Sequence, residues 1–309
     1  MTLRRFGVDT TFVQSADPED YAKAIRPNTK VLFAETVANP SGEVADIAGL
    51  ADVAHAHGIP LVIDSTIATP YLNRPIEWGA DIITHSATKF LGGSGSTLGG
   101  IVVESGRFHY SAEKFPLFHE PVPSYGGLNW AGNFGEFAFL TRLRAEQLRD
   151  MGPSMSAGAA SLLATGVESL PFRMQAHVDN ARIVAEWLDA DPRIEAVNWA
   201  GLPGHPHHDR ALKYLPKGPG SVFSFEVKGG REVGRTLIES VDLASHVANI
   251  GDAKTLIIHP ASTTHAQLSE QQLLDGGVRP GIVRLSVGIE DPDDIIYDLD
   301  QALTAAVRS

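Results

Sequence analysis

The fold is decided by two stretches, Ile59-Pro-Leu-Val-Ile-Asp64 and Ala80-Asp-Ile-Ile-Thr-His-Ser86-Ala-Thr88-Lys89, the second of which runs into Gly92-Gly-Ser-Gly95. Their apolar runs are short enough to be buried parallel strands. Each run ends in polar residues, and open α/β sheets bind ligands at the carboxyl ends of their strands. We expect one edge of a sheet to carry the side chains of Asp64, Ser86, Thr88 and Lys89.

These side chains match the parts of a pyridoxal phosphate site. A lysine amine bonds to the cofactor and must be partly desolvated, so that its neutral form is available. A carboxylate keeps the pyridine nitrogen protonated, and hydroxyls bind the phosphate. In the alternative reading Asp64 caps the next turn and Lys89 is a surface lysine. The site is favoured because Lys89 follows a buried strand and precedes the apolar pair Phe90-Leu91.

Several motifs, spread over nearly the whole chain, carry a family resemblance. They are Glu35-Thr-Val-Ala-Asn39-Pro40, Val62-Ile-Asp64-Ser-Thr66, Ser86-Ala-Thr-Lys89, His259-Pro-Ala-Ser-Thr-Thr-His265 and Val283-Arg284-Leu-Ser-Val-Gly-Ile-Glu290. With these motifs the sequence resembles the Cys/Met-metabolism pyridoxal-phosphate enzymes. The resemblance implies an α/β fold with an aspartate-aminotransferase-like (fold type I) large domain. Its sheet would be mostly parallel and of the seven-stranded type, followed by a smaller α+β C-terminal domain.

The same resemblance assigns roles at the cofactor. Lys89 would hold pyridoxal 5'-phosphate and then move protons as general acid and base, while Asp64 would face the ring nitrogen. Ser86 and Thr88 would help to bind the phosphate. Asn39, which by itself reads as a turn former beside a proline, would hydrogen-bond the ring oxygen.

Arg284 interrupts the apolar run Ile282–Val287, and a cation inside a buried strand needs an anionic partner. On physical grounds a structural salt bridge and a substrate carboxylate are equally good partners. The resemblance favours the carboxylate, which guanidinium binds in a bidentate pair. Asn249, expected near the substrate backbone, stands where lyases of the family often carry serine.

Within the family, the segment 245–260 and the long loop Leu117–Asn129 look most like the O-acetylhomoserine sulfhydrylases. We therefore expect a γ-replacement enzyme that converts O-acetylhomoserine and sulfide into homocysteine and acetate. A cystathionine or methionine γ-lyase, or a cystathionine γ-synthase, is the alternative, because all share the same carbanion chemistry. The choice between acetyl and succinyl esters stays open.

A third reading is an inactive or split-chain remnant that needs an N-terminal partner. Phosphate is commonly bound by a Gly/Ser-rich turn at a helix N-terminus. The residues before Lys30 contain a single glycine, Gly7, and no such turn. The chain is therefore expected to be N-terminally truncated and to bind the cofactor poorly by itself.

Composition narrows the function classes. The formal net charge of −12 argues against nucleic acid or an anionic membrane as a partner. The sequence has no cysteine, which excludes disulfides and thiolate metal sites, and no metal site is expected. Gly92–Ser96 is neither a dinucleotide-binding fingerprint nor a P-loop and precedes a strand, so a nicotinamide enzyme is rejected. We expect a cytoplasmic homo-oligomer, a dimer of dimers, that acts on an amino acid and on sulfide or a thiol.

The order of elements supports this fold class. Strands and helices alternate up to Glu104, which favours a parallel sheet, and an expected strand at Arg5–Val13 opens the chain. The irregular, aromatic-rich segment 107–133 is expected to be a lid, an insertion or an oligomer contact. Later strands and helices place a boundary between a large cofactor-binding domain, residues 1–171, and a small domain, residues 172–309. Strands are expected at Ile194–Trp199, Ser221–Val227, Thr255–His259 and Ile282–Ile289.

Overall fold

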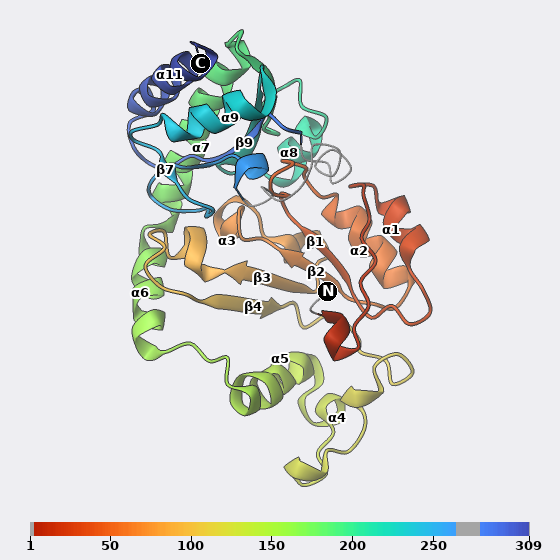
Figure 1. Cartoon of the computed structure of the whole chain (residues 1–309). Helices are drawn as coiled ribbons and strands as arrows, with labels where there is room; N and C mark the ends of the chain where they lie inside the picture. The colour runs from red at the N-terminus through yellow and green to blue at the C-terminus, as the bar shows by residue number, and fades with distance from the viewer. Residues whose placement is uncertain (1–2, 264–278, 309) are drawn as a thin grey trace.

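The computed structural model describes residues 3–263 and 279–308. Figure 1 shows a first sheet in the middle of the molecule, a second sheet above it and α4 and α5 below it. The part up to the first sheet's last strand comprises η1 (Leu3–Phe6), α1 (Pro18–Ala24), β1 (Leu32–Glu35), α2 (Ile47–Ala56), β2 (Leu61–Asp64), α3 (Thr69–Leu72), η2 (Pro75–Trp78), β3 (Ile82–Ser86), the π-helical turn η3 (Ala87–Leu91) and β4 (Gly100–Glu104).

The first sheet has the strand order β1-β2-β3-β4. The pairs β1–β2 and β2–β3 are parallel, with Leu32 opposite Leu61, and β4 runs antiparallel to β3. Because β1, β2 and β3 are parallel, their carboxyl ends meet at one edge, as expected from the two stretches that end in Asp64 and Lys89.

One face of this sheet is packed and the other is open. Side chains alternate between the two faces of a strand, so in β1 Leu32 is buried while Phe33 is 54% exposed. The packed face meets α2, which begins at the N-cap Asp46 as its acidic first residue predicts. The open face borders a groove of about 480 Å³ whose apolar lining includes Val62, Ile82, Val102, Tyr110, Phe118 and Phe139.

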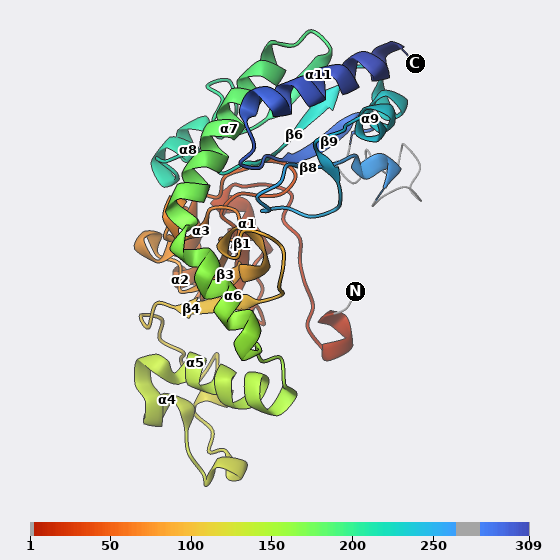
Figure 2. The ribbon, with the colours of Figure 1, turned by 90° about the vertical axis from the view of Figure 1, so that its left-hand side faces the viewer.

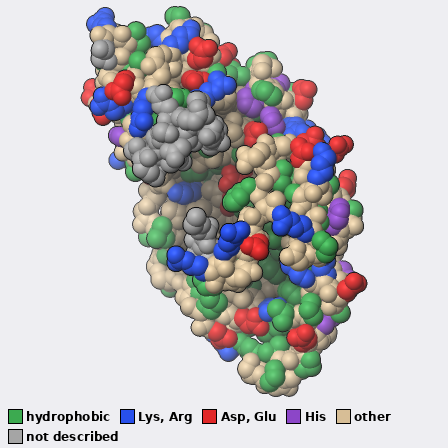
Figure 3. All heavy atoms as spheres, turned by 45° about the vertical axis from the view of Figure 1, so that its right-hand side comes forward, with side chains coloured by type: hydrophobic (Ala, Val, Ile, Leu, Met, Phe, Trp, Pro, Cys, Tyr) green, Lys and Arg blue, Asp and Glu red, His purple; other side chains and the backbone are tan. Residues whose placement is uncertain are grey.

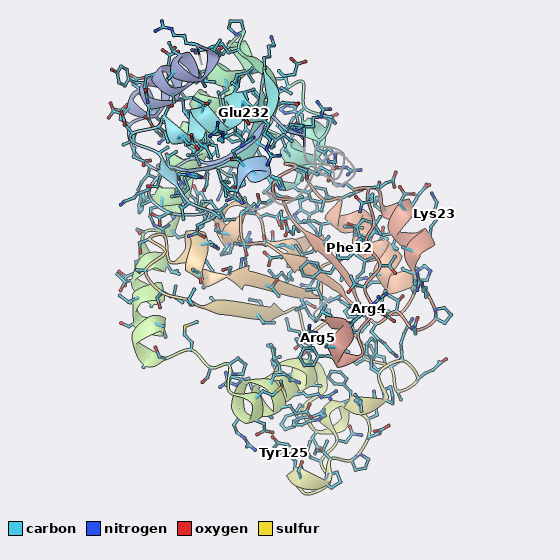
Figure 4. The ribbon with its side chains drawn as sticks, in the orientation of Figure 1. Arg4, Arg5, Phe12, Lys23, Tyr125 and Glu232 are labelled. Atoms are coloured by element: carbon cyan, nitrogen blue, oxygen red, sulfur yellow. The ribbon has the colours of Figure 1, made fainter. Side chains whose placement is uncertain are left out.

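The aromatic segment after β4 forms its own small cluster below the sheet. Tyr110, Phe118 and Trp130 are buried together, and Tyr110 stacks on Phe118 at a centroid distance of 4.5 Å. Its elements are η4 (Pro116–Phe118), η5 (Pro123–Tyr125), α4 (Trp130–Phe134), η6 (Gly135–Phe137), α5 (Ala138–Arg142) and the π-helical η7 (Leu143–Met151). Figure 4 places Tyr125 in this lowest part of the molecule, and Glu232 in the upper part.

Two helices connect the lower and upper parts. α6 (Ala157–Glu168) and α7 (Leu170–Ala190) follow one another along one side of the molecule (Figure 2). Met174 of α7 packs in the core of the first sheet, whereas Val184 and Leu188 pack in the core of the second. Pro171 occupies the first turn of α7, where a proline is tolerated. The predicted domain boundary at residues 171/172 falls inside this helix and stays a prediction.

The second sheet has the order β5-β6-β9-β8-β7. It is antiparallel except between β7 and β8, and α7, α9 and α11 supply helical side chains to its core. The elements are β5 (Ile194–Asn198), α8 (His208–Tyr214), β6 (Val222–Val227), α9 (Gly230–Glu239), β7 (Ser245–His246), β8 (Leu256–Ile258), η8 (Pro260–Ser262), β9 (Ile282–Ser286) and α11 (Pro292–Arg308). This mixture of strands and helices agrees with the expected α+β domain.

Two expectations about strands differ from the structure. The stretch Arg5–Val13 is not a strand: it begins in η1 and continues without regular structure, and none of the described strands pairs with it. Its apolar side chains contact little, since Phe6 and Phe12 are 75% and 81% exposed. Figure 4 labels Phe12 on this segment. The resemblance also implied seven strands in the first sheet, whereas the described residues form four.

Side chains of every type share the surface. Figure 3 shows hydrophobic side chains among Lys, Arg, Asp and Glu over the lower part of one face. Among the residues with a described structure, no helix is long and apolar enough to cross a membrane.

Candidate active site

The carboxyl ends of β1, β2 and β3 carry polar side chains on the open face of the sheet. Glu35 lies opposite Asp64 in the register of β1 and β2, and Asp64 lies opposite Thr84 in β3. One oxygen of Asp64 accepts a 2.9 Å hydrogen bond from the Thr66 amide, and the other accepts a 3.1 Å bond from the Thr84 hydroxyl. The half-buried carboxylate is therefore held by two neighbours and keeps lone pairs for a further donor.

Lys89 lies in η3, directly after β3, and is half-buried. Its ammonium donates a hydrogen bond to the side-chain oxygen of Asn249. Burial lowers the pKa of Lys89, and the positive charge of Arg284 lowers it further. A larger share of the amine is then neutral at a given pH, which is the form that bonds to an aldehyde.

Arg284 is the middle residue of β9 and is half-buried. Its Nη2 donates a 2.9 Å hydrogen bond to the backbone oxygen of Asn249, and burial lowers its pKa. No carboxylate of residues 3–263 or 279–308 forms an ion pair with it, so the structural salt bridge considered above is not formed there. Two cations, Lys89 and Arg284, thus lie together, and no acid among the described residues neutralises them, which is the arrangement of an anion-binding site.

Asn39 is exposed in the loop between β1 and α2. Its backbone amide donates a 3.3 Å hydrogen bond to Glu35, whose pKa is raised first by burial and then by the charge of Asp64. The next residue, Pro40, accepts a 2.9 Å hydrogen bond from the Ser224 hydroxyl, and Ser224 pairs with Arg284 across β6 and β9. The Asn39 loop is thereby tied to the strand that carries Arg284.

The two hydroxyls expected at the phosphate differ in their surroundings. The Ser86 amide donates a 2.8 Å hydrogen bond to the Thr66 hydroxyl, which anchors the end of β3 to the end of β2. The Thr88 hydroxyl donates to the Gly99 carbonyl at 3.3 Å and accepts from the Gly99 amide at 3.0 Å. Thr88 would have to exchange this donor bond in order to donate to a phosphate.

Sequence reasoning missed three side chains that shape this site. Thr66 and Thr84 hold Asp64 and Ser86, and their signal was a hydroxyl at the end of each neighbouring strand. Arg173, on α7, donates to carbonyls of the Lys89 turn, and nothing in its local sequence indicated this. The predicted motif His259–His265 lies partly outside the described residues, which end at Thr263 before the gap.

The donor set fits pyridoxal phosphate. It offers an amine of lowered pKa on Lys89, a fixed carboxylate on Asp64 and an unneutralised guanidinium on Arg284. These are the groups that the cofactor's aldehyde, its ring nitrogen and a substrate carboxylate need.

Comparisons with known proteins agree with this chemistry. The chain is 45% identical to the homocysteine synthase of Schizosaccharomyces pombe over 99% of its length and 72% of the relative's length. It is 46% identical to the O-acetyl-L-homoserine sulfhydrylase of Leptospira meyeri, over 98% of the chain and 70% of that protein.

A solved structure is similar as well. The putative O-acetylhomoserine (thiol)-lyase of Campylobacter jejuni, which carries a pyridoxyl-lysine phosphate, superposes with a TM-score of 0.92 at 38% identity. The superposition covers 98% of this chain and 72% of that one, which confirms the predicted fold class. The family described as "Cys/Met metabolism PLP-dependent enzyme" matches residues 1–304, and the chain belongs to this family of pyridoxal-phosphate-dependent enzymes.

Proposed function

We propose that this protein catalyses γ-replacement on O-acetylhomoserine, with sulfide as the incoming nucleophile and homocysteine and acetate as products. The observation that carries the proposal is the pairing of Lys89, whose pKa is lowered, with Arg284, whose charge no described acid neutralises. Relatives named homocysteine synthase and O-acetyl-L-homoserine sulfhydrylase support the choice of substrate.

Each residue of the site has a separate role in the proposed reaction. Arg284 binds the substrate α-carboxylate, and the backbone oxygen of Asn249 orients the guanidinium for it. Pyridoxal phosphate, when bound, supplies the electron sink that stabilises negative charge at the substrate Cα. Lys89 removes and returns protons through Nζ, since its lowered pKa makes the neutral amine accessible.

The remaining predicted residues hold the cofactor. Asp64 keeps the proton on the pyridine nitrogen with a carboxylate that Thr66 and Thr84 fix. Ser86 and Thr88 donate hydroxyls to the phosphate, and Asn39 donates to the ring oxygen. These roles follow from the family motifs that the residues occupy.

Parallel assays with different substrates test which reaction the protein catalyses. The purified protein is given pyridoxal phosphate and equal concentrations of O-acetylhomoserine with sulfide, of cystathionine, or of methionine. We expect homocysteine formation to be the fastest reaction. Faster release of ketobutyrate from methionine or cystathionine would assign the protein to the γ-lyases instead, and O-succinylhomoserine in parallel decides which ester is used.

We further propose that the protein is a homo-oligomer, a dimer of dimers, and that it is located in the cytoplasm. Ile101 and Val103 lie on the same face of the edge strand β4 and are both 39% exposed, which supports self-association, because monomers seldom expose contiguous apolar patches. Analytical ultracentrifugation tests this, and a monomer at every concentration would contradict it.

A further inference from the structure

A single arginine on α7 holds the turn that carries Lys89. Arg173 Nη1 donates a 2.7 Å hydrogen bond to the Phe90 carbonyl, and its Nη2 donates a 3.2 Å bond to the Leu91 carbonyl. The same Nη2 donates at 2.6 Å to the carbonyl of Gly166 near the end of α6, and Nε donates at 3.1 Å to the Ser169 hydroxyl. One side chain thus joins the turn after Lys89 to the α6–α7 junction.

Backbone carbonyl groups, rather than carboxylates, accept hydrogen bonds from the Arg173 guanidinium. Burial is the cause that lowers the pKa of Arg173, and no ion pair to it forms among the residues whose structure is described. Its positive charge instead lies at the C-terminal end of α6, where the helix dipole presents its negative end, and beside the carbonyls of the turn that carries Lys89. This half-buried cation therefore fixes backbone rather than forming a salt bridge.

Glycines make the close approach possible. A Cβ on Gly93, whose φ is +80°, would lie 2.3 Å from Arg173 Nη1, and a Cβ on Gly166 would lie 2.4 Å from the Gly92 oxygen. On the opposite side, a Cβ on Gly251 would lie 2.9 Å from Lys89 Cβ. The turn is therefore enclosed by α6 and α7 on one side and by the loop after Asn249 on the other.

The same helix also reaches the strand of Arg284. One turn after Arg173, His177 contacts the Phe90 ring edge-to-face at 5.1 Å, and its Nδ1 donates at 2.8 Å to the Val287 carbonyl. Asn180 then donates to the carbonyls of Gly288 and Glu290. α7 is thus attached both to the Lys89 turn and to the residues that follow β9.

We propose that Arg173 is a positioning residue for Lys89, which holds the η3 turn so that the lysine amine stays beside Asn249 and Arg284. The proposal rests on the cofactor-binding role proposed for Lys89. Arg173 acts through the carbonyls of Phe90 and Leu91, and does not touch the substrate.

The first test measures the turn itself by amide hydrogen exchange of the whole chain. In Arg173→Ala, peptides covering residues 87–93 should exchange faster, while peptides from β6 should not change. The matched control is Arg182→Ala, which removes an exposed arginine from the same helix. Unchanged exchange at 87–93 would overturn the proposal, and this readout does not depend on any activity of the protein.

The second test measures the reactivity of Lys89. Protein is mixed with pyridoxal phosphate, reduced with borohydride at timed intervals, and the label on Lys89 is quantified by mass spectrometry. We expect the labelling rate and kcat of Arg173→Ala to fall by about 100-fold, the scale of a misplaced reacting group. The KM for the amino-acid substrate should change little, because Arg284 stays in place.

Chemical rescue separates positioning from a general loss of structure. Added guanidinium ion should restore much of the labelling rate of Arg173→Ala, whereas methylammonium should not, because only guanidinium offers the planar set of donors.

Arg173→Lys is a second variant for the case in which the alanine variant does not fold. It keeps the positive charge and one donor, and Lys89 in this variant should be labelled at an intermediate rate. Wild-type labelling by Arg173→Lys, or equal rescue by both cations, would refute the proposal. Failure of wild-type Lys89 to be labelled would instead refute the function proposed for the lysine, and leave the exchange test standing.

Discussion

Arg284 Nη2 lies 2.9 Å from the backbone oxygen of Asn249, and the side-chain oxygen of the same asparagine accepts a hydrogen bond from Lys89. Asn249 thus joins a cation of the turn that follows β3 of the first sheet to a cation of β9 in the second sheet. Burial lowers the pKa of Lys89, and the repulsion between the two cations lowers it further. A substrate carboxylate entering there would meet both cations. This relationship makes the role of each cation separately testable.

Replacing Lys89 by alanine should abolish covalent binding of pyridoxal phosphate. Turnover should fall by at least about 100-fold, because a positioned acid or base contributes that much or more. Mass spectrometry after borohydride reduction measures the label. Lys23→Ala, which removes an exposed lysine of α1 (Figure 4), should label like the wild type. A label found on another lysine would disprove the assignment.

Asp64→Asn should retain the cofactor but lose turnover. The asparagine oxygen can accept from the Thr66 amide while its NH2 group donates to the Thr84 hydroxyl, yet it carries no charge to hold the ring nitrogen protonated. We expect kcat to fall by about 100-fold, the scale of losing one preorganised electrostatic group. Cofactor retention is followed by absorbance after dialysis. Undiminished turnover would show that the ring-nitrogen role is wrong.

Arg284→Ala should raise KM for every amino-acid substrate, with a loss of about 2–5 kcal/mol of binding free energy for the carboxylate. The labelling of Lys89 should persist, since the cofactor does not require the guanidinium. Arg235→Ala, which removes an exposed arginine paired with Glu232, is the control and should leave KM unchanged. An Arg284→Ala protein that unfolds while Arg284→Lys keeps wild-type KM would favour a structural role.

His177 should make the fold sensitive to acid. It is fully buried, and burial lowers its pKa from 6.5 to about 4. The unfolded chain therefore binds a proton as pH falls below 6.5, whereas the folded chain does not until about pH 4. The stabilising contribution of neutral His177 is complete above 6.5 and is lost as pH falls towards 4.

Urea unfolding of the wild type and of His177→Gln, at about pH 7.5 and about pH 5, measures this effect. The stability advantage of the wild type should shrink by about 2 kcal/mol at the lower pH, because each unit of separation in that window is worth about 1.4 kcal/mol. An advantage that is equal at both pH values would mean that His177 does not titrate in this range.

Much of the local structure could be predicted because its causes are local. Asp46 caps α2 through its own side chain, and Asp17 caps α1 in the same way. The short apolar runs that end in Asp64 and Ser86 are parallel neighbours, so their polar ends meet at one edge. In each case the residues that determine the feature, such as a helix cap or the polar end of a strand, lie within a few residues of it in the sequence.

The incorrect or missing predictions concern contacts with residues that are distant in the sequence. Arg5–Val13 has the composition of a strand, but a strand needs a neighbour to pair with, and none of the described strands accepts it. The hydrogen bonds between the Thr88 hydroxyl and the backbone of Gly99 cross a glycine-rich loop whose path no pattern specified.

By itself the sequence determined the elements, the parallel pairing of the first strands and the chemistry of their ends, because these depend on side-chain periodicity and on capping. Only the tertiary structure decided that Arg284 lies beside Lys89, that Asn249 bonds both, and that Arg173 holds the turn that carries Lys89. Those contacts join residues that are far apart along the chain. The long-range packing of α7 and β9 sets them, and a half-buried charge acquires its pKa and its partner only when that packing is complete.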